Sequence, residues 1–204
     1  GPTVTLSGST TGNVVTTTIN HQNPPGAPFS RGLHVAKSGS GSWTVSGVVS
    51  VAGTVTINGG TLTLSGANSF NGQLTVASGM LSVPSVNDSN ANGPLGRSTA
   101  AVILGASAGR TGWLQHTGTN VSSSTKPFTM ASGGTGVFDI VSATAELTLS
   151  GAIGGSGAMT KTGAGTLLLA GLNSYSGDTR VEAGTLALGG STTLSDASAL
   201  WIES

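Results

Sequence analysis

The chain has no cysteine, and of its 204 residues only 7% are charged and 4% are aromatic. The absence of cysteine fits a protein that is exported and works outside the cell. Seven basic and seven acidic residues cancel to a net charge of zero, so we expect no nucleic-acid partner. No run of about 18 apolar residues occurs, so we expect no direct insertion into a membrane. No basic and then apolar leader opens the chain, so we expect any export signal to lie outside it.

Glycine, serine and threonine take the place of the missing charged and aromatic residues. The chain contains 34 glycines, while 36% hydrophobic residues and a mean hydropathy of +0.20 indicate a packed core rather than disorder. No charged linker divides the sequence, so we expect one continuous body over residues 1–204. Gly1-Pro2 is typical of the remnant of a cleaved tag, and the chain ends close after a strand-like segment at 199–202. We therefore interpret the sequence as a piece of a longer protein.

Short runs in which apolar and polar residues alternate follow one another along the chain. Leu62 and Leu64 form one such run, and Leu147 and Leu149 form another. A period of two argues against helices and predicts short strands with one buried and one wet face. Asn and Gly between the runs supply turn positions. The sequence therefore predicts an all-β protein.

One segment of the chain occurs twice. Residues 60–83 read GTLTLSGANSFNGQLTVASGMLSV and residues 165–188 read GTLLLAGLNSYSGDTRVEAGTLAL, at an offset of 105 residues (165 − 60). Within each copy a leucine recurs after 19 residues, as in Leu62 and Leu81 (81 − 62). A unit that cannot bury its own apolar face buries it against a neighbour, so a fixed repeat predicts stacked copies. We expect a right-handed parallel β-helix, or β-solenoid, of about ten coils of ~20 residues rather than a β-sandwich.

A third, partial copy extends the repeat toward its N-terminal side. KSGSGSWTVSG at 37–47 aligns without gaps on KTGAGTLLLAG at 161–171. Trp43 takes the place of a leucine, so we expect it to belong to the core rather than to bind a ligand. Lys37 and Lys161 share one repeat position, and we expect both to be surface lysines. A Lys–Asn isopeptide bond with Asn68 or Asn173 is the alternative, and it would need a buried carboxyl catalyst.

The longer form of the repeat resembles the autotransporter-associated β-strand repeat, also called the passenger-associated transport repeat. The copy at 157–188 departs from the family pattern mainly in Ser174, where Thr is usual, and the copy at 59–83 is looser. Residues 93–150 resemble the spacer between such repeats. The resemblance implies a β-helical passenger of a large protein that crosses a Gram-negative outer membrane, with its translocator elsewhere, and it associates the repeat with secretion and folding rather than catalysis.

Asp88-Ser-Asn90-Ala-Asn92-Gly93 resembles the first half of a calcium loop, because oxygen ligands alternate and Gly permits a sharp bend. Position twelve of that loop is Thr99 instead of a bidentate Glu, so we expect an Asn-rich turn and no metal site, with a calcium site as the alternative. The three histidines are far apart in the sequence and suggest no zinc site. We expect no cofactor.

Catalysis would require paired carboxylates, and the chain has only seven acidic residues. Residues about one coil apart become neighbours in a solenoid, and two such carboxylate pairs exist, Asp178 with Asp196 and Glu182 with Glu203. We expect accidental proximity here, and no enzyme. A polysaccharide lyase or glycosidase is the third hypothesis for the function.

Phe70 and Tyr175 share one turn position of the repeat and are candidates for stacking on sugars, with an internal aromatic ladder as the alternative. Thr54 and Thr56, and the similar pair at 61 and 63, could line a glycan-binding face, although outward Thr is also a good strand residue. A glycan-binding adhesin module is therefore the second hypothesis for the function.

The first hypothesis is a non-catalytic structural passenger or stalk segment of a secreted or surface-displayed, autotransporter-like protein. Its expected partners are other segments of the same long protein and, under the second hypothesis, surface glycans. Open ends of a solenoid expose unpaired strands, so we also expect end-to-end self-association.

Overall fold

The computed structural model describes residues 1–20, 32–106, 108–189, 194 and 199–202. This part of the chain contains strands and turns but no helix, as the alternation of apolar and polar residues predicts. The strands are β1 (Thr3–Leu6), β2 (Asn13–Val15), β3 (Ile19–Asn20), β4 (His34–Lys37), β5 (Ser42–Val45), β6 (Val49–Ser50), β7 (Val55–Ile57), β8 (Thr61–Leu64), β9 (Leu74–Val76), β10 (Gly79–Val83), β11 (Val102–Leu104), β12 (Thr111–His116), β13 (Ser122–Ser124), β14 (Phe128–Met130), β15 (Thr135–Ile140), β16 (Glu146–Leu149), β17 (Ile153–Gly155), β18 (Ala158–Thr162), β19 (Thr166–Leu169), β20 (Thr179–Val181), β21 (Thr185–Leu188) and β22 (Leu200–Ile202).

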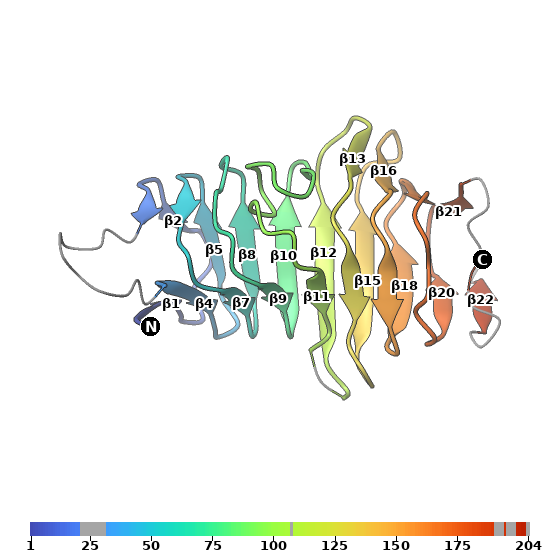
Figure 1. Cartoon of the computed structure of the whole chain (residues 1–204), viewed down its shortest axis with the longest axis horizontal. Helices are drawn as coiled ribbons and strands as arrows, with labels where there is room; N and C mark the ends of the chain where they lie inside the picture. Colours follow the sequence, from blue (N-terminus) through green and yellow to red (C-terminus); the bar gives the residue numbers. More distant parts are fainter. Residues whose placement is uncertain (21–31, 107, 190–193, 195–198, 203–204) are drawn as a thin grey trace.

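The strands form a parallel β-solenoid, which confirms the expected fold class. Every strand pairs in parallel with strands of the coil before or after it. A seven-stranded sheet runs β1-β4-β7-β9-β11-β14-β17, and a nine-stranded sheet runs β2-β5-β8-β10-β12-β15-β18-β20-β22. A four-stranded sheet, β13-β16-β19-β21, and a two-stranded sheet, β3-β6, form further sides of the coils. Figure 1 shows the strands side by side along the long axis, with the two termini at opposite ends.

The solenoid makes about seven turns, fewer than the ten expected from a constant step of ~20 residues. Inside the repeats one coil takes few residues, since the hydroxyl of Ser69 bonds that of Ser50, 19 residues earlier. In the middle of the chain one coil takes more residues, since the hydroxyl of Ser82 bonds the side chain of Gln115, 33 residues later. A longer coil uses more residues for one 4.7–4.9 Å step between strands, so the same chain completes fewer turns.

The core is a set of apolar rows that run along the solenoid axis. In the nine-stranded sheet, Leu62 stacks on Leu81, Leu81 on Leu114 and Leu114 on Phe138. All four side chains have 0% exposure. Leu167 likewise stacks on Leu186, so the 19-residue leucine spacing does mark one coil, as expected. Each fully buried Leu contributes about 1.5–3 kcal/mol, which lets a chain with few aromatic residues build a core.

Trp43 begins one of these rows, in agreement with the expectation from the repeat. It lies in register with Leu62 and packs, partly buried, against the core. Its indole N–H donates to the carbonyl oxygen of Ser7 at 3.2 Å. The tryptophan therefore replaces a core leucine.

The two long copies of the repeat lie on different sides of the solenoid. β8, in the first copy, belongs to the nine-stranded sheet, whereas the matching strand β19 belongs to the four-stranded sheet. The coils between the two copies therefore do not add up to a whole number of turns. Equivalent side chains of the two copies consequently do not form one continuous row.

Candidate functional site

Lys37 is fully buried, and the expectation that it is a surface lysine was wrong. Its Nζ donates to the carbonyl oxygens of Ser38 at 2.8 Å, Gly39 at 2.9 Å and Gly59 at 3.0 Å. An ammonium group has three N–H donors, and all three are used here. The first two acceptors belong to the turn after β4, and the third, Gly59, is 22 residues after Lys37. The side chain thus joins two successive coils.

Lys161 repeats this arrangement in the second half of the chain. It is also fully buried, and its Nζ donates to the carbonyl oxygens of Thr162 at 2.7 Å, Gly163 at 2.8 Å and Ala183 at 3.0 Å. The acceptors again lie one, two and 22 residues after the lysine. We call each lysine with its three carbonyl acceptors a lysine clamp. Neither lysine donates to an Asn, so nothing in this geometry favours the isopeptide alternative.

Two glycines of the Lys-x-Gly pattern make room for the clamp. Gly39 and Gly163 have φ angles of +72° and +75°, a region that favours glycine. This turn aims two successive carbonyls at the Nζ atom. In the next coil, a Cβ atom on Gly60 would lie 2.6 Å from Lys37 Nζ and 2.3 Å from the carbonyl oxygen of Gly41. The repeat therefore needs Gly at these positions for the same reason that it needs Lys.

Burial changes the acidity of both clamp lysines. Loss of hydration lowers the pKa of Lys37. Burial also lowers the pKa of Lys161 to about 8, although the nearby carboxylate of Asp139 opposes the shift. The methylene stem of Lys161 lies in the inward row between Phe138 and Val181, so the apolar part of the side chain contributes to the core.

Phe70 and Tyr175 are both at 0% exposure and cannot stack on a sugar from the surface. Tyr175 shares a 2.7 Å hydrogen bond between its hydroxyl and Thr179 Oγ1. Phe70 packs against the segment after β10, because a Cβ atom on Gly96 would lie 2.3 Å from its ring. Both rings are therefore internal, but among the described residues the ring contact is between Phe128 and Phe138, so Phe70 and Tyr175 form no aromatic ladder with each other.

Comparison with known families identifies the repeat. The profile of the Passenger-associated-transport-repeat matches residues 35–64, 59–83 and 159–188. Three segments of this chain are therefore similar to the passenger-associated-transport-repeat. Lys37 and Lys161 lie inside the first and the third matched segments. The middle segment begins at residue 59, and just before it Ile57 lies in register with Lys37, so an isoleucine stands there instead of a lysine.

A curated relative carries similar sequence. The Adhesin BmaC autotransporter of Brucella suis biovar 1 (strain 1330) is 42% identical over 94 residues, which cover 43% of this chain. The chain spans about 3% of the length of that relative. No solved structure matches the chain. In the described part of the chain, no helix is long and apolar enough to span a membrane.

The asparagine of the repeat has different partners in different copies. Asn68 is fully buried, and its Oδ1 accepts a hydrogen bond from the backbone N–H of Val49 at 2.8 Å. In the last repeat, the backbone N–H of Ile153 donates instead to the carbonyl of Leu172 at 2.9 Å. The amide of Asn173 is buried without a partner among the described residues. In the last repeat a backbone carbonyl, that of Leu172, therefore accepts the hydrogen bond that the Asn68 side chain accepts in the middle repeat.

Lys126, between the repeats, is a third buried lysine, and the sequence analysis did not single it out. Its Nζ donates to the carbonyl oxygen of Ser98 at 2.6 Å, across 28 residues. Burial lowers its pKa to about 8, and the carboxylate of Asp88 opposes that shift. The chain has three lysines, and all of them are buried.

The calcium candidates Asp88, Asn90 and Asn92 are all exposed. Asp88 Oδ1 accepts a hydrogen bond from the backbone N–H of Thr125 at 2.9 Å, and Asn90 Oδ1 accepts one from Arg97 at 3.3 Å. Across the described residues, no group of three or more His, Cys, Asp and Glu side chains gathers in one place. The contacts of these residues are those of an Asn-rich turn.

Asn87, next to the calcium candidates, organises this turn. Its Nδ2 donates to the carbonyl oxygens of Asp88 at 3.1 Å, Ala91 at 2.9 Å and Gly96 at 2.8 Å. Its Oδ1 accepts from the backbone N–H of Leu95 at 2.8 Å. One nearly buried amide therefore holds a ten-residue turn in place. Asn87 lies outside both the repeats and the alternating Asp88-Asn90-Asn92 pattern, so no sequence motif marks it.

His116 is buried in an apolar row between Val83 and Ile140. Its exposure is 1%, and neither ring nitrogen has a hydrogen-bond partner among the described residues. Burial lowers the pKa of this imidazole, so it is neutral at pH 7. It lines a cavity of about 190 Å³. Ser85, Thr119, Asn120 and Ser122 line the same cavity, but none of them bonds the imidazole.

The carboxylates proposed as possible catalytic pairs have structural partners. Asp178 Oδ1 accepts a hydrogen bond from the backbone N–H of Ala199 at 3.2 Å, and Glu182 pairs with Arg180 at 3.2 Å. Asp196 and Glu203 lie outside the described residues. The threonine pairs do not share one surface, since Thr56 is in the seven-stranded sheet and β8 in the nine-stranded sheet.

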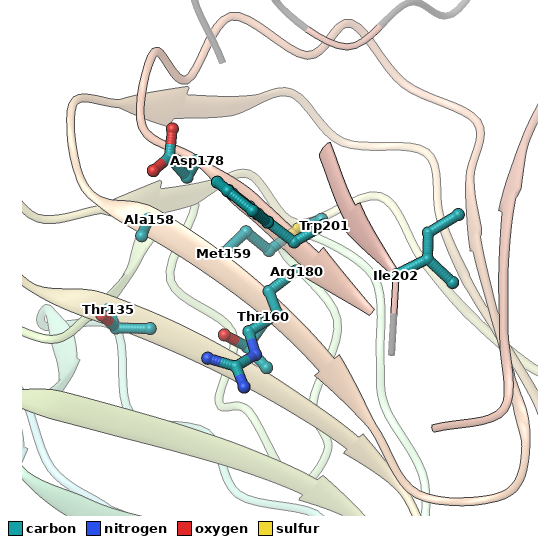
Figure 2. A pocket seen from close by; sticks show the side chains of 8 residues that line it. All are labelled: Thr135, Ala158, Met159, Thr160, Asp178, Arg180, Trp201 and Ile202. Carbon is teal, nitrogen blue, oxygen red and sulfur yellow. The ribbon is translucent and has the colours of Figure 1, made fainter. Parts of the chain in front are cut away.

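A cavity with several polar lining residues lies on the outer face of the last repeat. It has a volume of about 480 Å³, and Figure 2 shows its lining. Arg180 lies in register with Thr160 on one side and with Trp201 on the other. Trp201 is 60% exposed. The sequence analysis noted Trp201 only as part of a terminal strand. The residues that line the cavity are Thr135, Ala158, Met159, Thr160, Asp178, Arg180, Trp201 and Ile202.

Proposed function

We propose that the chain is a non-catalytic structural segment of the passenger of an autotransporter-like protein, secreted or displayed on a Gram-negative cell. Its coils support the export, folding and display of the rest of that protein. The three repeats and the similarity to an autotransporter adhesin support this proposal. The single observation that carries it is the lysine clamp, which occurs twice with equivalent acceptors.

The clamp explains what the repeat contributes to a passenger. Each clamp ties the turn of one coil to a carbonyl in the next coil, so a newly added coil is fastened as soon as it pairs. Contacts between adjacent coils are near in sequence, and such contacts allow a solenoid to fold by propagation. A chain that emerges from a membrane gradually can then fold in the order in which it emerges.

The non-catalytic part of the proposal is supported by how the polar residues are used. The described carboxylates of the C-terminal coils cap a backbone N–H or pair with Arg180. The buried lysines bond carbonyl groups, and burial holds His116 neutral. These contacts describe a scaffold in which polar groups stabilise the fold.

A full-length protein with Lys37→Met and Lys161→Met tests the proposal. Each substitution leaves three buried carbonyl acceptors without their donor, which costs about 2–4 kcal/mol per clamp. We expect less protein on the cell surface and more degraded or retained chain, measured by surface proteolysis and immunoblotting. Arg110→Gln is the matched control, because it removes a positive charge at an exposed position. Wild-type display of the double variant, together with an unchanged unfolding midpoint of the isolated segment, would contradict the proposal.

A further inference from the structure

We propose that the cavity beside Trp201 binds a neutral saccharide. This inference goes beyond the structural role above, because a scaffold needs no ligand. The cavity of about 480 Å³ has room for one or two sugar rings. It lies on the outward face of the nine-stranded sheet, where its last strand, β22, pairs with β20.

Trp201 supplies the apolar surface of the site. It is 60% exposed, although the other two tryptophans, Trp43 and Trp113, are partly buried. An exposed indole offers a large rigid face at little cost in side-chain entropy. A sugar ring has an apolar face of C–H groups that matches such a surface. Figure 2 shows the indole between Asp178 and Arg180 in this view.

The polar groups around the indole match the rim of hydroxyl groups on a sugar. Asp178 Oδ1 accepts from Ala199, and no described residue bonds its other carboxylate oxygen, Oδ2. Thr160 is only 8% exposed, which puts its hydroxyl at the floor of the cavity. A few convergent polar groups beside an apolar surface are typical of small-molecule sites. A carboxylate acceptor and a hydroxyl on two sides of an indole can bind two hydroxyls of one ring.

The local charge selects a neutral sugar. Arg180 is paired with Glu182 at 3.2 Å, so its charge is already balanced. Asp178 adds a further negative charge at the cavity. Sulfated and sialylated glycans would be repelled by this surplus carboxylate. The chemistry therefore fits a neutral oligosaccharide whose rings present an apolar face.

Titration of the segment with cellotetraose tests the proposal, by ligand-observed NMR and by tryptophan fluorescence. We expect saturable binding in about the millimolar range, as is usual for a shallow site. Trp201→Ala should weaken binding at least ~10-fold, the loss typical of removing a central aromatic contact. Asp178→Asn, which keeps the shape of the side chain, should also weaken it. Trp113→Ala is the matched control, since Trp113 lies in the same outward row of the sheet but outside the cavity.

Several outcomes would overturn this proposal. One is the absence of saturation up to about 20 mM sugar, well above the expected range. Another is equal loss of binding in the Trp113 variant. Tighter binding of sialyllactose than of cellotetraose would show that the ligand is not a neutral sugar. A dimer that forms with increasing protein concentration, is abolished by Trp201→Ala and does not respond to sugar would show that this surface binds a second copy of the chain. Surface display of the Trp201 variant separates the two proposals, because the structural role predicts that it stays at the wild-type level.

Discussion

At the scale of single residues, the main feature is that the protein places its lysines inside. A buried ammonium group loses its hydration, and this cost is offset only if its hydrogen bonds are made within the protein. Each clamp provides three carbonyl acceptors within 3.0 Å. Carbonyl groups carry no charge, so the clamp retains part of the desolvation cost, and the pKa of Lys161 falls to about 8.

Burial of every lysine predicts that the folded protein resists acylation. Native protein treated with an N-hydroxysuccinimide acetate should be labelled at the α-amino group of Gly1 and not at Lys37, Lys126 or Lys161. The same reagent should label all three lysines after unfolding in guanidinium chloride. Peptide mass spectrometry measures the modified fraction at each site. Rapid labelling of Lys161 in the native protein would show that the clamp is open.

The lowered pKa values predict that stability rises with pH in the mildly alkaline range. Lys126 and Lys161 have a pKa of about 8 when folded, against 10.5 for an unperturbed lysine. Between these values the unfolded chain binds more protons, so the free energy of unfolding increases as the pH rises. The increase is up to about 3 kcal/mol for each lysine.

Urea unfolding at pH 7.5, 8.5 and 9.5 measures this dependence. The Lys161→Met variant should show a smaller increase than the wild type. The series stops at pH 9.5 because burial raises the pKa of Tyr175, whose ionisation in the unfolded chain lowers stability at higher pH. A wild-type stability that falls steadily from pH 7.5 to 9.5 would contradict the expected direction.

At the scale of structural elements, the longest coils are stabilised by side chains within their turns. The turn after β10 carries no strand, yet its backbone is bonded by Asn87 at four points. Ser124 Oγ also donates to the carbonyl of Asn87 at 2.6 Å, which attaches the turn to the next coil. Asparagine is suited to this work because its amide has both donors and an acceptor.

The central role of Asn87 leads to a prediction with a matched control. Asn87→Ala removes all four bonds and leaves buried backbone groups unpaired, so we expect a loss of about 2–4 kcal/mol. Amide exchange of Leu95 and Gly96 should become faster. Asn92→Ala, at an exposed position five residues away, should change stability by less than about 0.5 kcal/mol. Thermal unfolding and hydrogen exchange measure both effects, and equal stability of the two variants would show that the turn does not depend on Asn87.

At the scale of the whole molecule, the solenoid has an apolar C-terminal end. Leu188, Leu200 and Ile202 are 44%, 52% and 73% exposed, and they line a cavity of about 280 Å³. β22 is an edge strand of the nine-stranded sheet. Unpaired edges with exposed apolar side chains favour the addition of another strand. This end therefore fits either a further coil or a second copy of the chain.

The exposed end predicts end-to-end association of the isolated segment. Sedimentation velocity should show dimers or longer species that increase with protein concentration. Leu200→Lys and Ile202→Lys should return the protein to a monomer, because charges at an edge oppose pairing. Val141→Lys, which changes an exposed apolar residue elsewhere, is the control and should not affect association. A wild-type segment that stays monomeric at all concentrations would contradict this prediction.

The periodicity of the side chains was enough to predict the class of fold and the unit that builds it. The alternation of Leu with Thr and Ser predicted strands, and the 19-residue spacing of Leu62 and Leu81 predicted which residues stack. These features are local, since they depend on side-chain periodicity and on the length of one coil. The order of Lys, Gly and Asn in the repeat was also visible in the sequence, but the contacts that these residues make were not.

The position of these residues inside or outside the solenoid follows from the way the coils pack. Lys37 looked like a surface residue because a lysine is rarely buried, and the sequence does not show that its side chain points inward, toward carbonyl groups of its own turn and of the next coil. The side of the solenoid on which each repeat lies depends on the summed lengths of all intervening coils, so a longer turn rotates everything after it. Trp201 stands beside Asp178 and Arg180 for the same reason: neighbours across coils are set by register, and register is a property of the whole stack.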